Sequence, residues 1–147
     1  MLIQILANFI TSLFFAMMFN INGKRLIYAA CTGAIGGTIL YLLTSNHINK
    51  IEALFVATLI ISILSEIIAR KTKSPVIFYL LPSLIPLVPG AGMYYTMLNV
   101  VKEDYDMALN VGLNTLLEVS SIVIASTIIS SFIKIIIYYK NRKIRKV

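Results

Sequence analysis

The sequence predicts an all-α fold, a polytopic membrane bundle of about five transmembrane helices whose fourth helix is interrupted by proline and glycine. Apolar residues (Ala, Val, Ile, Leu, Met, Phe, Trp, Tyr and Cys) make up 59% of the 147 residues, and only 13% are charged. The mean hydropathy is +0.88, whereas soluble domains carry about a quarter charged residues. Too few polar groups remain to cover a soluble surface. The apolar runs are continuous rather than alternating, which disfavours a porin-type barrel.

Charged and turn-forming residues divide the chain into five apolar segments, each near the ~20 residues that a membrane span needs. The first segment has no basic residue before it and no small-residue cleavage pattern after it, so we expect a retained span rather than a signal peptide. The longest connector is a polar stretch at 102–110, and a basic tail follows at 140–147. The whole chain, 1–147, is expected to form one membrane domain with spans at about 1–19, 26–45, 51–70, 75–99 and 112–138.

The formal net charge is +7, and the basic residues gather at the ends of the predicted spans. With five crossings, ten of them fall on one side and two on the other, while Lys134 lies inside the last span. This asymmetry predicts that the N-terminus lies outside the membrane and the C-terminus in the cytoplasm. It also excludes nucleic acid as a partner. The ten are Lys24, Arg25, Arg70, Lys71, Lys73, Lys140, Arg142, Lys143, Arg145 and Lys146, and the two are Lys50 and Lys102.

The second segment carries small residues at every fourth position. Ala29, Gly33 and Gly37 share one face of a helix, and small side chains let another helix approach closely. The pattern is common, so it predicts packing and says nothing about chemistry. Cys31 lies in the same run and is expected to be a small buried thiol.

Two glutamates are candidates for coupling transport to proton movement, since intramembrane carboxylates mark functional sites. Glu66 precedes Arg70 by four residues, a spacing that also favours a structural ion pair. Glu118 lies early in the long fifth segment and is either a proton relay inside the membrane or a group at its outer interface.

All four prolines lie in the fourth segment, at Pro75, Pro82, Pro86 and Pro89, followed by Gly90 and Gly92. The last three prolines each remove a helical hydrogen bond, which leaves the carbonyls of Phe78, Pro82 and Ile85 without their partners. In lipid such a break persists only where protein or an aqueous cavity covers it. Interrupted helices near mid-membrane recur at transporter binding sites; a packing kink and a re-entrant loop are the competing interpretations.

Polar side chains inside other segments leave two more interpretations open. Gln4, Asn8 and Thr11 share a face of the first segment and bond to other helices or line a substrate path. The fifth segment is polar on two faces, which indicates a larger assembly. No catalytic motif appears, so we expect no enzyme, no cofactor and no metal site. The two faces of the fifth segment consist of Ser120, Thr127 and Ser131 and of Asn114, Glu118 and Ser121.

Three stretches of the chain occur in an order that resembles the small subunit of the threonine/serine exporter family. They are residues 15–20, the small-residue segment with Gly33 and Gly36, and the run 81–90 with Tyr94 beyond it. Relatives in that family include a bacterial succinate exporter. The resemblance implies a larger multi-span partner subunit and export of small carboxylate metabolites, either threonine/serine-type amino acids or dicarboxylates. It implies that Asn20, Pro86, Pro89, Gly90 and Tyr94 match the family pattern.

The sequence and this resemblance therefore predict a subunit of a secondary transporter in the lipid bilayer of the bacterial cytoplasmic membrane. A half-helix that begins near Gly90 offers free N–H groups and a positive dipole end to a carboxylate. We expect the substrate pathway to be bordered by Pro86, Pro89, Gly90, Gly92, Tyr94 and Asn20. The alternatives are a non-transporting membrane scaffold, or accessory subunit of another complex, and a small channel formed by oligomers of this chain.

Overall fold

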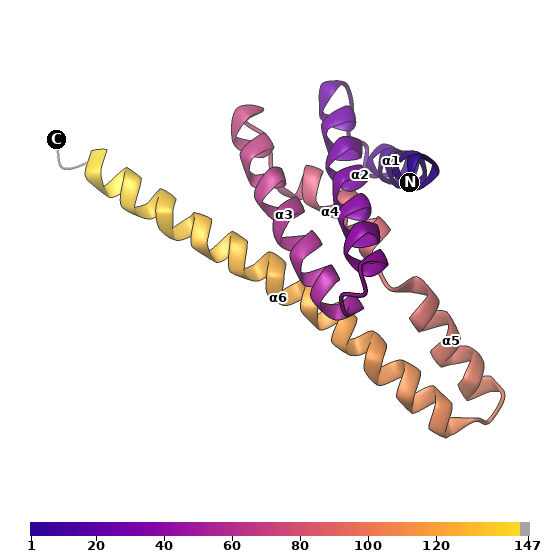
Figure 1. Cartoon of the computed structure of the whole chain (residues 1–147). Coiled ribbons are helices and arrows are strands. Elements are labelled where there is room, and N and C mark those ends of the chain that lie inside the picture. Colours follow the sequence, from indigo (N-terminus) through magenta and orange to yellow (C-terminus); the bar gives the residue numbers. More distant parts are fainter. Residues whose placement is uncertain (145–147) are drawn as a thin grey trace.

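The computed structural model describes the backbone of residues 1–144 and the side chains of residues 1–138. Over that range the protein is helical and contains no strand. An all-helical membrane bundle with a bent helix pair is thereby confirmed (Figure 1). The elements are α1 (Leu2–Met18), α2 (Lys24–Ser45), α3 (Lys50–Lys71), α4 (Ile77–Leu84), the 3₁₀ turn η1 (Ile85–Leu87), α5 (Gly90–Val101) and α6 (Tyr105–Ile144).

The first four helices form the body of the molecule, with α2 at its centre. Helix α2 contacts α1, α3, α4 and η1. Helix α1 is seen almost end-on in Figure 1 while α2 and α3 run along the plane of the view, so α1 crosses α2 steeply. Helices α2 and α3 lie side by side and are joined by a short turn, which places the start of α2 and the end of α3 at the same end of the body (Figure 1).

The crossing of α1 and α2 depends on the small residues of α2. A Cβ atom added to Gly33 would collide with the Ser12 side chain, and one added to Gly37 would collide with Asn8. Ser12 is fully buried. The G-x-x-x-G pair of α2 therefore packs against α1 of the same chain, with backbone atoms in place of side chains at the contact.

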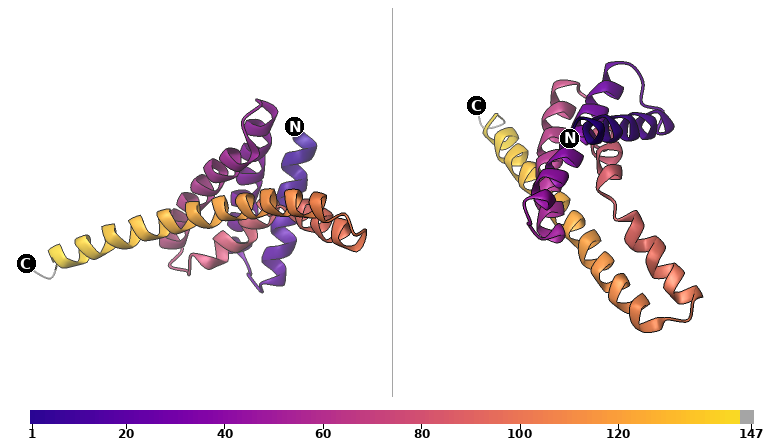
Figure 2. Two further views of the ribbon diagram at one scale, coloured as in Figure 1. Left: turned by 90° about the horizontal axis from the view of Figure 1, so that it is seen from below. Right: turned by 45° about the vertical axis from the view of Figure 1, so that its right-hand side comes forward.

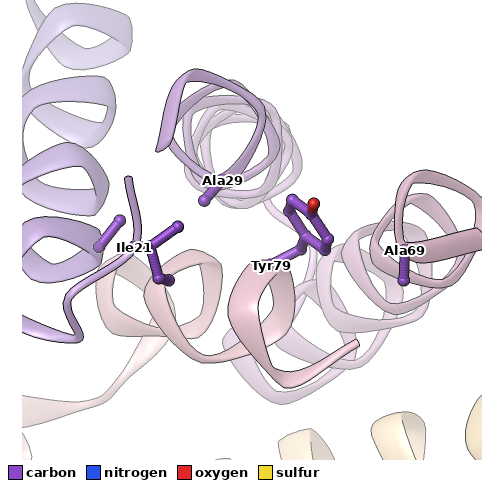
Figure 3. Packing of buried hydrophobic residues seen from close by; sticks show 5 residues of the cluster. Ile21, Ala29, Ala69 and Tyr79 are labelled. Atoms are coloured by element: carbon purple, nitrogen blue, oxygen red, sulfur yellow. The ribbon is translucent and has the colours of Figure 1, made fainter. Parts of the chain in front are cut away.

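Tyr79 of α4 joins three segments of the body. It is fully buried and packs with Ile21, Ala29 and Ala69, which come from the α1–α2 turn, α2 and α3 (Figure 3). Its hydroxyl lies 2.7 Å from Thr72 Oγ1. A buried tyrosine needs such a polar partner, and this one ties the beginning of α4 to the end of α3.

Helices α5 and α6 form an arm that extends away from the body (Figure 2). The two helices meet through reciprocal pairs in which a glycine of one faces a threonine of the other. A Cβ added to Gly92 would collide with Thr115, and one added to Gly112 would lie 3.2 Å from Thr96 Cγ2. The second half of α6 continues past α3, as Figure 1 also shows.

Four helices end in a left-handed residue that is not glycine. These residues have φ values of 49 to 61°, and the backbone bonds around each follow the Schellman pattern. At the end of α3, for example, the Lys73 N–H donates to the Arg70 carbonyl at 3.3 Å and the Ser74 N–H to the Ala69 carbonyl at 2.9 Å. The left-handed residues are Asn20, His47, Lys73 and Glu103.

By length and composition, three described helices can cross a membrane: α2, α3 and α6 over Tyr105–Tyr138. The number of spans rises to four if α4–η1 and α5, which are bent by 54° relative to each other, count together as one span. The sequence predicts about five. Helix α1 has 17 residues, about 25 Å in length, which is shorter than the ~30 Å hydrocarbon core.

Two finer expectations are wrong. The connector predicted at 102–110 is helical from Tyr105 onward, because α6 begins there with the Asp104 carboxylate accepting from the Met107 N–H at 3.2 Å. Cys31 is exposed rather than buried, since it faces away from the side of α2 that packs on its neighbours. The basic residues predicted for the tail lie outside the described side chains.

Candidate functional site

The fourth predicted span breaks at Val88–Gly90. Pro86 lies in the 3₁₀ turn η1, Val88 is extended with φ −62° and ψ 128°, and Pro89 has φ −77° and ψ 59°. The Gly90 N–H donates to the Val88 carbonyl at 2.8 Å. These values describe an inverse γ-turn centred on Pro89. One tight turn therefore produces the 54° bend, and the second half-helix begins at Gly90, as the sequence predicts.

The carbonyl groups before the break are only partly as predicted. Pro82 and Pro86 have no N–H, so no backbone donor exists four residues after Phe78 or Pro82. The Ile85 carbonyl, however, accepts from the Val88 N–H at 3.2 Å. The prediction that Ile85 lacks a partner is wrong, because the 3₁₀ turn supplies a donor three residues later.

Gly90 is exposed, and a Cβ added to it would meet no atom within 4 Å. Pro89 precedes α5 without providing a side-chain hydrogen bond to its first turn. The start of α5 is thus uncapped and open to approach, which suits a carboxylate. Tyr94, one turn further, is 62% exposed and packs edge-to-face with Tyr95 at a centroid distance of 5.4 Å.

Two of the predicted pathway residues have structural roles in this chain. Gly92 faces Thr115 of α6, so its missing side chain serves the α5–α6 contact. Asn20 is the left-handed residue that ends α1, and its neighbour Ile21 packs in the cluster around Tyr79. The break packs instead through Leu87 in a second cluster with Leu54, Ala57, Ile61 and Ile122. Pro86, Pro89 and Gly90 lie at the break itself, whereas Asn20 ends α1 beside the cluster around Tyr79.

Both candidate carboxylates form an ion pair, one near each end of α3. Glu66 Oε2 lies 3.2 Å from an Arg70 guanidinium nitrogen, the pairing that the four-residue spacing indicates. Glu118 Oε2 of α6 lies 2.8 Å from Lys50 Nζ, at the first residue of α3. Lys50 and Arg70 are separated by about 30 Å of helix, close to the thickness of the hydrocarbon core. The two pairs therefore bracket a span.

Among the side chains of residues 1–138, no group of three or more His, Cys, Asp or Glu residues is placed to hold a metal ion. What the described geometry offers is an interrupted membrane helix with an open, uncapped half-helix. The model of a family described as threonine/serine exporters matches residues 4–132. The chain belongs to the threonine/serine exporter family.

The matched region covers the break in the fourth predicted span and most of α6. The chain is also similar to an uncharacterised protein of Haemophilus influenzae, with 28% identity over 88 residues. That alignment covers 60% of this chain but only 30% of the relative. No solved structure matches the chain.

Sequence reasoning missed the most deeply buried polar side chains. Five buried polar atoms have no hydrogen-bond partner among the described residues, and three of them belong to α3. A polar face on α1 is predictable, but its most buried hydroxyl is Ser12 rather than Thr11, which donates to the Ala7 carbonyl. Serine and threonine spaced along α3 were the available signal. The five atoms are Asn8 Nδ2, Ser12 Oγ, Thr58 Oγ1, Ser62 Oγ and Ser65 Oγ.

Proposed function

We propose that this chain is one subunit of a secondary transporter that exports small carboxylate metabolites across the bacterial cytoplasmic membrane. The substrates are threonine/serine-type amino acids or dicarboxylates such as succinate. The γ-turn at Pro89 is the observation that carries the proposal. Membership of an exporter family gives the class of activity, and a break of this kind is how transporters expose backbone groups to a substrate inside the membrane.

The open start of α5 would bind the substrate carboxylate. Its first-turn N–H groups and the positive end of the helix dipole favour an anion. Gly90 leaves room for the ligand to reach the backbone, and the Tyr94 hydroxyl lies one turn further along the same helix. A scaffold protein needs none of these features, so the break argues for transport over the scaffold alternative.

A larger multi-span subunit of the same family is the proposed partner. The second polar face of α6 supports it, since Ser120, Thr127 and Ser131 are exposed in this chain. The Thr127 hydroxyl donates to the Val123 carbonyl at 2.7 Å, which leaves its outer side available to another helix. Hydroxyl-bearing residues on an apolar helix are favoured at helix–helix contacts in membranes. They are costly against lipid alone.

Export from vesicles that contain this chain with the larger family member tests the proposal. Efflux of labelled threonine, serine and succinate is measured with each subunit alone and with both. We expect efflux only from the pair. Efflux from this chain alone would favour the oligomeric channel, and no efflux of any carboxylate from a correctly assembled pair would reject the exporter.

Gly90→Leu locates the site within that experiment. A Cβ at this position meets no atom within 4 Å, so assembly should be unaffected and efflux should fall at least about tenfold through steric exclusion of the ligand. Val101→Leu, at an exposed position at the far end of α5, is the matched control and should export normally. Normal efflux from Gly90→Leu would mean that the break is a packing kink.

A further inference from the structure

Three hydroxyls on α3 are buried without any hydrogen bond. Thr58, Ser62 and Ser65 are at most 2% exposed, and none has a partner among the described residues. Helical serines and threonines in this protein usually bond to a carbonyl of the preceding turn, as Thr32 does with Tyr28 at 2.8 Å and Thr115 with Val111 at 2.7 Å. The three hydroxyls on α3 lack this hydrogen bond. Unpaired buried polar groups are rare because they cost free energy.

The three residues share one face of α3, at positions i, i+4 and i+7. The residues beside them on this face show what it packs against. Ile61 clusters with Leu87 of η1, and Leu80 and Leu84 of α4 pack on that cluster. Further along, Ala69 clusters with Tyr79 of α4. The unpaired hydroxyls therefore lie on the side of α3 that faces the centre of the body, where the proline-interrupted segment α4–η1 and helix α2, through Ala29, are its neighbours.

Water does not satisfy these hydroxyls in the present conformation, because their oxygen atoms have almost no accessible surface. An interface built only for stability would place apolar residues here, as it does at Ile61. These hydroxyls gain hydrogen bonds to other molecules when α4–η1 separates from α3 and polar molecules enter. The closed arrangement thus carries a penalty that an open arrangement removes.

We propose that Thr58, Ser62 and Ser65 line the transport pathway, which runs between α3 and α4–η1 and is closed in this conformation. When it opens, the hydroxyls donate to the carboxylate of a small metabolite and accept from an ammonium or hydroxyl group that it carries. The γ-turn at Pro89 ends the moving wall, so this face and the open start of α5 adjoin the same interrupted segment. The inference rests on the proposed transport function and adds the residues of the second wall.

Thiol accessibility in membrane vesicles tests the opening without any need for transport. In the full chain with its partner, Cys31 is replaced by serine, and Ser62→Cys or Ser65→Cys introduces a single thiol of nearly the same size. A membrane-impermeant thiosulfonate reagent then modifies the thiol. Ala53→Cys is the matched control, since Ala53 is also fully buried and lies on the opposite side of α3 from Ser62.

We expect Ser62→Cys and Ser65→Cys to react at least about tenfold faster than Ala53→Cys, and an exported substrate to slow the reaction. Equal rates for the three thiols would overturn the proposal. Efflux measured on the same vesicles separates the two claims. Fast labelling without export of any carboxylate would support the opening at α3 but reject the proposed exporter function. Normal export with unreactive thiols would mean that the pathway lies elsewhere.

Ser62→Ala provides a second, independent measurement. Removing an unpaired buried hydroxyl should raise the melting temperature of the closed protein, while efflux falls about five- to tenfold, the loss expected for one hydrogen bond to substrate. A raised melting temperature with unchanged efflux contradicts a role in the pathway, as does a lowered melting temperature, which would mean that the hydroxyl has a structural partner.

Discussion

The body and the arm of this protein are built from equally apolar helices but bury them very differently. In α2 and in α3, 39% of the most apolar 18-residue stretch is buried within the chain, against 17% of such a stretch in α6. Helix α5 has no fully buried residue. The body supplies its own neighbours through small residues and a buried tyrosine. The arm contacts the body mainly through the first half of α6. Apolar composition alone therefore says that a helix belongs in the membrane, and only the packing says whether protein or lipid covers it.

Cysteine labelling in intact cells gives an all-or-none test of how the arm continues from the body. His47→Cys and Lys73→Cys lie at opposite ends of α3, and the basic end that includes Lys73 is expected in the cytoplasm. If α4–η1 and α5 together cross the membrane, Glu103→Cys labels from the outside together with His47→Cys. Labelling of Glu103→Cys and Lys73→Cys from the same side would establish a re-entrant loop.

Gly33→Leu should produce the largest loss of stability, because the new side chain collides with Ser12 and crowds the backbone at Ser83. We expect the free energy of unfolding in detergent to fall by about 3 kcal/mol. Gly90→Leu, in the arm, is the paired variant and should change it little, since that position is open. Equal losses at both positions would mean that the arm is as tightly packed as the body.

Replacing a left-handed residue by glycine should stabilise the helix end that it closes. Lys73→Gly is expected to raise the free energy of unfolding by about 1 kcal/mol, because glycine adopts positive φ without the Cβ clash. Lys71→Gly, inside the last turn of α3, should lower it by about the same amount. Glu103→Gly in the arm should shift the thermal unfolding of the body less than Lys73→Gly does; an equal shift would show that body and arm unfold together.

The smallest expected effect concerns the outer face of α6. Thr127→Val should leave the stability of this chain unchanged and weaken its binding to the larger subunit about threefold, the value of one hydrogen bond of ~0.6 kcal/mol between membrane helices. Affinity measured in nanodiscs checks this. Ile136→Val, on the opposite side of α6 from Thr127, is the control, and an equal loss there would indicate general lipid packing rather than a specific contact.

Local signals predicted the features that local chemistry decides. Proline and glycine determine backbone geometry wherever they occur, so the start of the second half-helix at Gly90 could be read directly. The Glu66–Arg70 pair follows from spacing on one helix. Helix α6 starts at Tyr105 although the residues around it are polar, because a helix end exposed to water tolerates charge and Asp104 provides a first-turn acceptor.

Contacts between helices could not be predicted from the sequence, for a physical reason. The glycines of α2 predict that another helix approaches closely, but they do not predict that Ser12 and Asn8 are the residues in contact with them. Lys50 and Glu118 are 68 residues apart, and nothing in either segment specifies the other. The hydroxyls of α3 look like ordinary helix residues in one dimension. Only the placement of α4–η1 beside them makes their missing hydrogen bonds visible.

The length of α6 has a consequence for the membrane around it. Its candidate span, Tyr105–Tyr138, has 34 residues, or about 50 Å of helix, against ~30 Å of hydrocarbon. Tilting alone would have to reach about 50° to resolve this hydrophobic mismatch, beyond the range of about 0–40° seen for membrane helices. The bilayer by itself is too thin to cover the whole helix, so the remainder lies outside the hydrocarbon core, in water at its polar start or against a second protein surface.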